Sequence, residues 1–274
     1  MITAPIHPDT SAINPQPRIR SCGVAASEQR LHPLLTATVQ ALEQANLRWC
    51  LLREPTNPEA PTGDVDLLIH PTDRLAVFQI LKGLGFVRLP AWGYGSAGFF
   101  LGYHPGTDHW IWLHVVFELA FGPYYRVKTG AEEGCLARRE QNEALAELAP
   151  DDAFWVLLLH CLLDKRKIAS RHRAGLRELV TQARADSPLA TFTGEICPSG
   201  WSPASMITAA KRQEWTRLER LAPSLVGTAL RQAPIATHQR LALAGLQRTS
   251  QMLNILRPMM WRRYFGQRRW RVVP

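Results

Sequence analysis

The chain has 274 residues, of which 46% are hydrophobic, and a formal net charge of +9, which indicates a globular protein of one large or two ordinary domains. No apolar run reaches the ~18 residues of a membrane span, and we expect no secretory signal, because the first thirty residues lack a continuous apolar segment. Five scattered cysteines without a C-x-x-C pair argue against a disulfide framework and against a zinc site. Reduced thiols suggest a cytoplasmic protein, and the positive charge favours anionic partners such as nucleotides, nucleic acid, glycans or a membrane surface.

The first third of the chain alternates between helical and extended patterns. Residues 1–27 hold four prolines among small and polar residues, which predicts a mobile N-terminal tail. Leucines at helical spacing then predict a helix up to about residue 47. The segments that follow are a strand at 48–54, a proline-rich turn at 55–63, a strand opening at Asp64, and a helix at 71–86.

The middle of the chain predicts a hairpin of long strands at 98–104 and 109–122, joined by the turn "PGTD". The remainder is helical, with helices expected at 131–146, 151–168, 171–185, 203–222 and 236–256. We therefore predict an α+β fold, with a mixed sheet and flanking helices followed by an all-α C-terminal domain. The predicted boundaries are 28–130 for the α/β domain, 131–260 for the helical domain, and 261–274 for a basic aromatic segment.

An acidic pair opens the second strand, in "PTGDVDLLIH" at residues 61–70. Alternate residues of a strand point to one face, so Asp64 and Asp66 project together with Cα atoms about 6–7 Å apart. Two carboxylates so placed suit a hard cation such as Mg²⁺, which brings phosphate oxygens with it, and Gly63 leaves room for a phosphate near the backbone. The alternative is an acidic turn whose side chains bond the backbone.

The order of these elements adds a resemblance. "LLR" at 51–53, "DVDLLI" at 64–69, a helix ending in "GLGF", "WLHVVFELAFG" at 112–122, "CLARR" at 135–139 and "LLHCLLDKRKI" at 158–168 together resemble the nucleotidyltransferase superfamily. The similarity is greatest to a bacterial branch with an "LLR…DVDLLV" signature, labelled thymidylate-kinase-like or polysaccharide-biosynthesis-linked. It spans about residues 30–185 and implies a nucleotidyltransferase-like sheet, whose D-x-D strand holds Mg²⁺ and whose neighbouring strand carries a third carboxylate.

The resemblance assigns roles to single residues. Asp64 and Asp66 match the metal ligands, and Arg53 is expected to bind a phosphate or, equally, to form a surface salt bridge. His114 stands where the family has its third carboxylate. This departure leaves three options: altered chemistry with His114 as general base, an acid borrowed from Asp108 or Glu118, or an inactive enzyme.

Two further patterns are a histidine–aspartate pair and a glycine-rich segment. His160 and Asp164 share a helix face, and a hydrogen-bonded pair within the core is the favoured interpretation, with Lys165 free to bind a triphosphate. "GYGSAG" at 93–98 is followed by a predicted strand, whereas a dinucleotide-binding site requires a helix after its glycines. The segment is therefore interpreted as a flexible loop, or as a lid over a nucleotide.

The predicted activity is Mg²⁺-dependent transfer of a nucleoside monophosphate from an NTP, with ATP the expected one, to a hydroxyl of a small molecule, sugar or glycolipid. The alternative is a degenerate fold that binds a nucleotide or a partner protein. Residues 261–274 interleave arginines with aromatics, which favours a docked segment first, peripheral membrane contact second and nucleic acid third.

Overall fold

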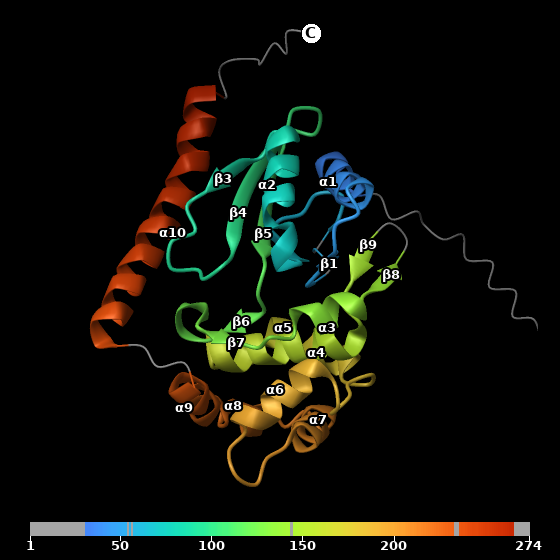
Figure 1. Ribbon diagram of the computed structural model, residues 1–274, viewed down its shortest axis with the longest axis vertical. Coiled ribbons are helices and arrows are strands. Elements are labelled where there is room, and N and C mark those ends of the chain that lie inside the picture. The colour runs from blue at the N-terminus through green and yellow to red at the C-terminus, as the bar shows by residue number, and fades with distance from the viewer. Residues whose placement is uncertain (1–30, 54, 56, 143–144, 233–235, 266–274) are drawn as a thin grey trace, which may run out of the picture.

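A seven-stranded mixed sheet forms the centre of the molecule (Figure 1). The computed structural model describes residues 31–53, 55, 57–142, 145–232 and 236–265, with side chains of the last helix described up to Asn254. The strands of this sheet, in spatial order, are β3 (Val87–Leu89), β4 (Gly98–His104), β5 (His109–Val116), β2 (Asp64–Ile69), β1 (Trp49–Leu51), β9 (Leu145–Glu147) and β8 (Glu140–Asn142). The β2–β5 and β1–β9 pairs are parallel and the others antiparallel.

Side-chain alternation gives this sheet two different faces. Val65, Leu67 and Leu113 are fully buried on one face, where α1 (Pro33–Gln44) and α2 (Arg74–Gly83) cover them. The close approach is visible at Gly102 of β4, where a Cβ would lie 2.7 Å from the side chain of Leu34. Asp64 and Asp66 therefore point to the other face, away from these two helices.

Helices follow the sheet in the second half of the chain. They are α3 (Glu132–Ala137), α4 (Pro150–Leu159), a π-helical turn (His160–Lys165), α5 (Ser170–Leu179), α6 (Pro188–Ile196), α7 (Pro203–Lys211), α8 (Trp215–Glu219), α9 (Ala222–Gln232) and α10 (Thr237–Phe265). A two-stranded sheet of β6 (Ala120–Phe121) and β7 (Val127–Lys128) joins the halves. The predicted fold class, a mixed sheet followed by a helical C-terminal part, is confirmed.

Several predicted elements differ from the structure. The expected helix at 131–146 is wrong in its second half, because 140–142 and 145–147 form the antiparallel strands β8 and β9, which extend the sheet beyond β1. The strand predicted over 109–122 ends at Val116, and the helix predicted over 203–222 is divided at residues 212–214. The helix α6 and, apart from its first residue, the helix α9 lie outside the predicted helices. The domain boundaries at 28–130 and 131–260 stay a prediction.

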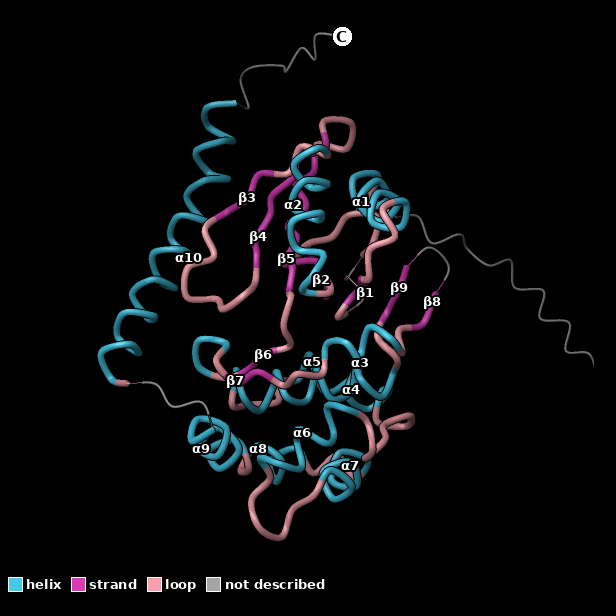
Figure 2. The backbone as a smooth tube through the Cα atoms, in the orientation of Figure 1, coloured by secondary structure: helices cyan, strands magenta, loops and turns pink. Residues whose placement is uncertain are grey.

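The last helix returns to the sheet (Figure 2). α10 runs along the β3 side, where its polar side chains bond the backbone of the loop before β4: Ser250 Oγ accepts from the N–H of Trp92 at 2.9 Å and Gln247 Nε2 donates to the carbonyl of Gly93 at 2.7 Å. The predicted tail at 1–27 lies outside the described residues, as do the side chains of 261–274. None of the described helices combines the length and apolarity that crossing a bilayer requires.

Candidate functional site

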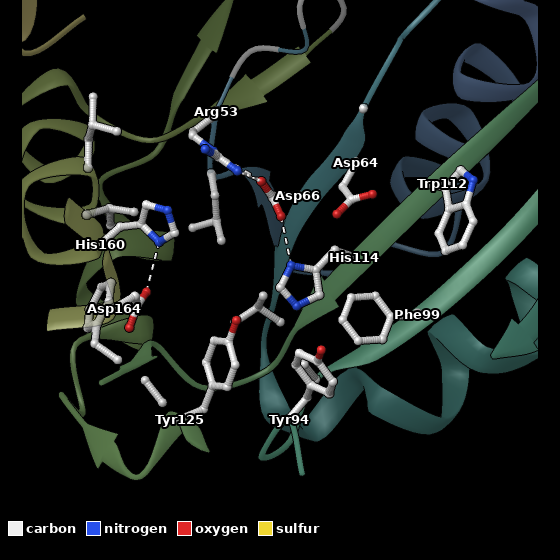
Figure 3. A pocket seen from close by; sticks show the side chains of 18 of the residues that line it. Arg53, Asp64, Asp66, Tyr94, Phe99, Trp112, His114, Tyr125, His160 and Asp164 are labelled. Carbon is white, nitrogen blue, oxygen red and sulfur yellow. Dashed lines mark hydrogen bonds and ion pairs between the residues drawn. The ribbon is translucent and has the colours of Figure 1, made fainter. Parts of the chain in front are cut away.

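A cavity of about 970 Å³ opens on the sheet face that carries the acidic pair (Figure 3). Its walls come from parts of the chain that are far apart in sequence. The sheet contributes Asp64, Asp66, Phe99, Trp112 and His114; the loops contribute Arg53, Tyr94 and Tyr125; the helices contribute His160, Asp164, Lys165, Arg171, His172, Gln251 and Asn254. The volume suits a nucleotide-sized ligand.

Asp66 is the centre of a hydrogen-bond network on the cavity floor. The parallel register of β2 and β5 sets Asp66 beside His114, and Nδ1 of His114 lies 2.7 Å from Asp66 Oδ1. Arg53 donates to the other oxygen, Oδ2, through Nη2 and through Nε at 3.1 Å. Burial alone raises the pKa of Asp66, but the bonds and charges of His114 and Arg53 outweigh it and lower that pKa to about 2.

The bond to Asp66 fixes the tautomer of His114. Since Asp66 is ionised, its oxygen only accepts, so Nδ1 of His114 carries the hydrogen and Nε2 is left with its lone pair when the ring is neutral. That Nε2 is buried and has no hydrogen-bond partner. The ring is stacked on Phe99, with centroids 4.7 Å apart and an interplanar angle of 15°. His114 is therefore held between Asp66 and Phe99, with its free nitrogen buried.

Asp64 lies in a different environment at the mouth of β2. Its side chain is exposed, and within the part of the chain that the structure describes it accepts no hydrogen bond. Nearby protein atoms and the charge of Asp66 raise its pKa, while His114 and Arg53 act in the opposite direction. Asp64 thus presents an exposed carboxylate next to the ionised Asp66, and a cation would relieve the repulsion between the two.

Positive groups gather on the opposite, helical wall. Lys165 and Arg171 line the cavity there, together with Arg53, which follows β1, and the imidazole of His172 lines the same wall. Burial, followed by the charges of Arg171, His160, Arg53 and Lys165, lowers the pKa of His172, so these groups act on one another across a short span. The cavity is acidic on its floor and basic on its helical wall, a division that suits a metal-bound anion.

A second histidine–carboxylate pair lies on this helical wall. His160 Nδ1 is 2.8 Å from Asp164 Oδ2, and Asp164 Oδ1 accepts from the backbone N–H of Gly122 at 2.6 Å. The hydrogen bond predicted between His160 and Asp164 is present. The predicted location within the core is wrong, because both residues line the cavity.

The comparisons with known proteins are sparse. No family model matches the chain, and no curated protein matches it. A solved structure, described as the solution structure of the antibiotic-resistance factor ANT(2'')-Ia, matches 68% of this chain and 94% of its own, with 14% sequence identity and a TM-score of 0.37. A likeness at this level does not assign a family.

The remaining predicted residues have clear positions. Gly63 lines the cavity and has open space where a Cβ would lie, so neither a strained backbone nor crowding requires glycine there. Glu118 lies beyond the end of β5 and binds Lys128 at 2.5 Å. Asp108 is not among the cavity residues and accepts a bond from the Tyr103 hydroxyl. Sequence reasoning missed the loop aromatics Tyr94 and Tyr125, which no spacing pattern connects to Asp64.

Proposed function

We propose that the chain is a Mg²⁺-dependent nucleotidyltransferase that moves a nucleoside monophosphate from an NTP, with ATP the expected one, to a hydroxyl of a small molecule, sugar or glycolipid. The observation that carries this proposal is the pairing of Asp64 and Asp66 on a cavity floor with a basic wall opposite. Binding of an NTP as its magnesium complex needs both signs of charge in one place.

The side chains at β2 fit a magnesium ion that arrives with phosphate. Among the described residues no group of three or more His, Cys, Asp or Glu side chains could hold a metal by itself. Mg²⁺, however, keeps several waters and is commonly held by one or two carboxylates plus substrate phosphates. Asp64 and Asp66 would supply the carboxylates, and Arg53 would have to share or release Asp66 Oδ2.

The side chains of the cavity would have different roles in the proposed reaction. When bound, Mg²⁺ neutralises charge on the phosphates and orients the leaving pyrophosphate. Arg53 and Lys165, together with Arg171, would bind phosphate oxygens, because guanidinium and ammonium groups donate several hydrogen bonds to anions. His114 would hold Asp66 in one orientation through its Nδ1–H. The cavity walls would exclude water from the attacking hydroxyl.

A second candidate function is nucleotide or partner binding without catalysis. Two observations favour it: a histidine takes the place of the third carboxylate, and Arg53 already neutralises Asp66. If Arg53 stays bound to Asp66 in place of a metal ion, a nucleotide would bind through the basic wall of the cavity alone. The two candidates differ in whether NTP binding requires Mg²⁺ and whether pyrophosphate is released.

One pair of measurements tests the proposal. An NTP should raise the melting temperature of the wild type only when Mg²⁺ is present. The Asp64→Asn, Asp66→Asn double variant should lose this shift, whereas Asp108→Asn, which lies outside the cavity, should keep it. Pyrophosphate release with mixed NTPs and a panel of sugar and glycolipid acceptors should exceed that of Asp64→Asn. A Mg²⁺-independent shift with no release would favour the binding module.

A further inference from the structure

The hydrogen bonds of the His160–Asp164 pair leave one nitrogen of His160 able to accept a proton. Asp164 is fixed at both oxygens, by the Gly122 N–H at 2.6 Å and by His160 Nδ1 at 2.8 Å. Its carboxylate therefore orients the imidazole and keeps the hydrogen on Nδ1, which leaves Nε2 as the free acceptor. Figure 3 shows this second nitrogen pointing away from Asp164 and toward Arg53. An imidazole so oriented can remove a proton from a hydroxyl at the cavity surface.

His114 and His160 differ in what their free nitrogens can reach. The Nε2 of His114 is buried, and its side chain is 15% exposed beneath Phe99. His160 is 24% exposed and faces the cavity. A general base must come within hydrogen-bond distance of the proton that it removes, or within one water of it. The free nitrogen of His114 is buried, whereas the more exposed ring of His160 is the better placed of the two to meet an acceptor hydroxyl.

The local backbone supports a special role for this position. His160 begins a π-helical turn at the end of α4, and Arg166, just after that turn, adopts a left-handed conformation with φ of 55°. π turns are rare and are frequent at functional sites, because the extra residue per turn redirects the side chains. On this turn His160 and Asp164 line the cavity, while Cys161 and Leu162 are buried.

We propose that His160, positioned by Asp164, is the general base of the transfer reaction and that His114 only positions Asp66. This inference rests on the proposed nucleotidyltransferase function. The acceptor hydroxyl gives its proton to His160 Nε2, its oxygen forms a bond to the α-phosphorus, and the bond from that phosphorus to the pyrophosphate oxygen breaks. Pyrophosphate leaves with the bond electrons, and His160 returns its proton to solvent.

The charged groups that face His160 belong to several elements. The charged or titratable groups that line the cavity with it include Arg53 after β1, the neutral Tyr125 between β6 and β7, Asp164 and Lys165 on the π turn, and Arg171 and His172 on α5. The ring of His172 lies 6.0 Å from that of His160. Because these groups also titrate, the pH–rate profile of the wild type has to be compared with that of a His160 variant.

The test compares binding with turnover in the full-length chain. His160→Gln should lower kcat for pyrophosphate release by about 10²–10⁴-fold, the range for loss of a general base. It should leave the Mg²⁺-dependent thermal shift by NTP intact and remove the acid limb of the pH–rate profile. Asp164→Asn should lower kcat in the same way, and imidazole added to His160→Ala should restore part of the turnover. His70→Gln, which lies outside the cavity, is the control with unchanged turnover.

The outcomes separate this inference from the function on which it rests. Wild-type turnover that persists in His160→Gln overturns the assignment of His160 alone. A wild type that binds Mg–NTP but releases no pyrophosphate with any acceptor overturns both proposals. Nitrogen chemical shifts test the pair without turnover: the neutral ring of His160 should carry its hydrogen on Nδ1, and a ring protonated on Nε2 instead would overturn the geometry.

Discussion

Asp66 and His114 lie opposite each other on the parallel strands β2 and β5, and a 2.7 Å hydrogen bond joins their side chains. The register of the parallel pair allows this contact, since both side chains point to the same face of the sheet. Arg53 holds the second oxygen of the same carboxylate. The cavity floor is thus organised before any ligand binds, and its stability should depend on the ionisation of Asp66.

Acid should weaken the fold through Asp66. Its folded pKa of about 2 lies below the ordinary value of about 3.9, so ionised Asp66 stabilises the fold at neutral pH by on the order of 2 kcal/mol. This contribution is complete above the unfolded pKa and is lost as the pH falls from about 4 to about 2. Urea unfolding of wild type and Asp66→Asn should show a free-energy gap at pH 7 that narrows by pH 3. A gap independent of pH would contradict the assigned shift.

Arg53 should have opposite effects on the metal and on the nucleotide. In Arg53→Gln, Asp66 loses a competing cation, so Mg²⁺ alone should bind more tightly. NTP should bind about 10–100-fold more weakly, because a charge-assisted bond to phosphate contributes about 1.5–3 kcal/mol. Calorimetric titrations of each ligand would measure both effects. Arg48→Gln is the matched control, since Arg48 pairs with His70 and Thr72 on the surface. Unchanged NTP affinity would leave Arg53 as a purely structural partner of Asp66.

The docking of α10 should depend on Gly93. This residue has φ of 79°, and a Cβ there would lie 2.6 Å from Gln247 Cγ and 2.9 Å from the Leu243 carbonyl oxygen. Gly93→Ala should therefore cost about 1–3 kcal/mol of stability and expose α10 to limited proteolysis. Gly83→Ala, with nothing within 4 Å of the added carbon, should leave stability unchanged or slightly raised. An intact α10 in Gly93→Ala would show that the loop moves to accommodate a side chain.

The sequence predicted best those elements whose signals lie within their own segment. The strand that opens at Asp64 and the strand over 98–104 have the predicted bounds within a residue, because alternation and turn signals lie in the segment itself. The pairing of β8 with β9 was missed because Glu140–Asn142 is exposed and polar, and β9 also pairs with the distant strand β1. Helical spacing placed His160 and Asp164 on one face, but no sequence period shows that this face meets the cavity and the N–H of Gly122.

Replacing His114 by aspartate tests whether the acidic pair binds Mg²⁺, through the melting temperature with and without Mg²⁺ and NTP. In His114→Asp a third carboxylate would stand beside Asp66, where the nucleotidyltransferase resemblance expects it. Without Mg²⁺, three nearby acids repel one another and the stacking of His114 on Phe99 is lost, so the melting temperature should fall below that of the wild type. With Mg²⁺ and NTP, the same carboxylates gain a shared cation, so the ligand-induced rise should exceed that of the wild type.

His114→Asn provides the control for that experiment, because it removes the imidazole without adding charge. It should show the lower melting temperature of a lost stacking contact but no larger Mg²⁺-dependent rise. Turnover distinguishes the roles further: His114→Asn should retain most pyrophosphate release if His160 accepts the proton, since the base is then untouched, and should lose it if His114 accepts the proton. If instead His114→Asp destabilises the fold and gains no extra stabilisation from Mg²⁺, the acidic pair does not gather a metal, and Arg53 is the only cation that Asp66 binds.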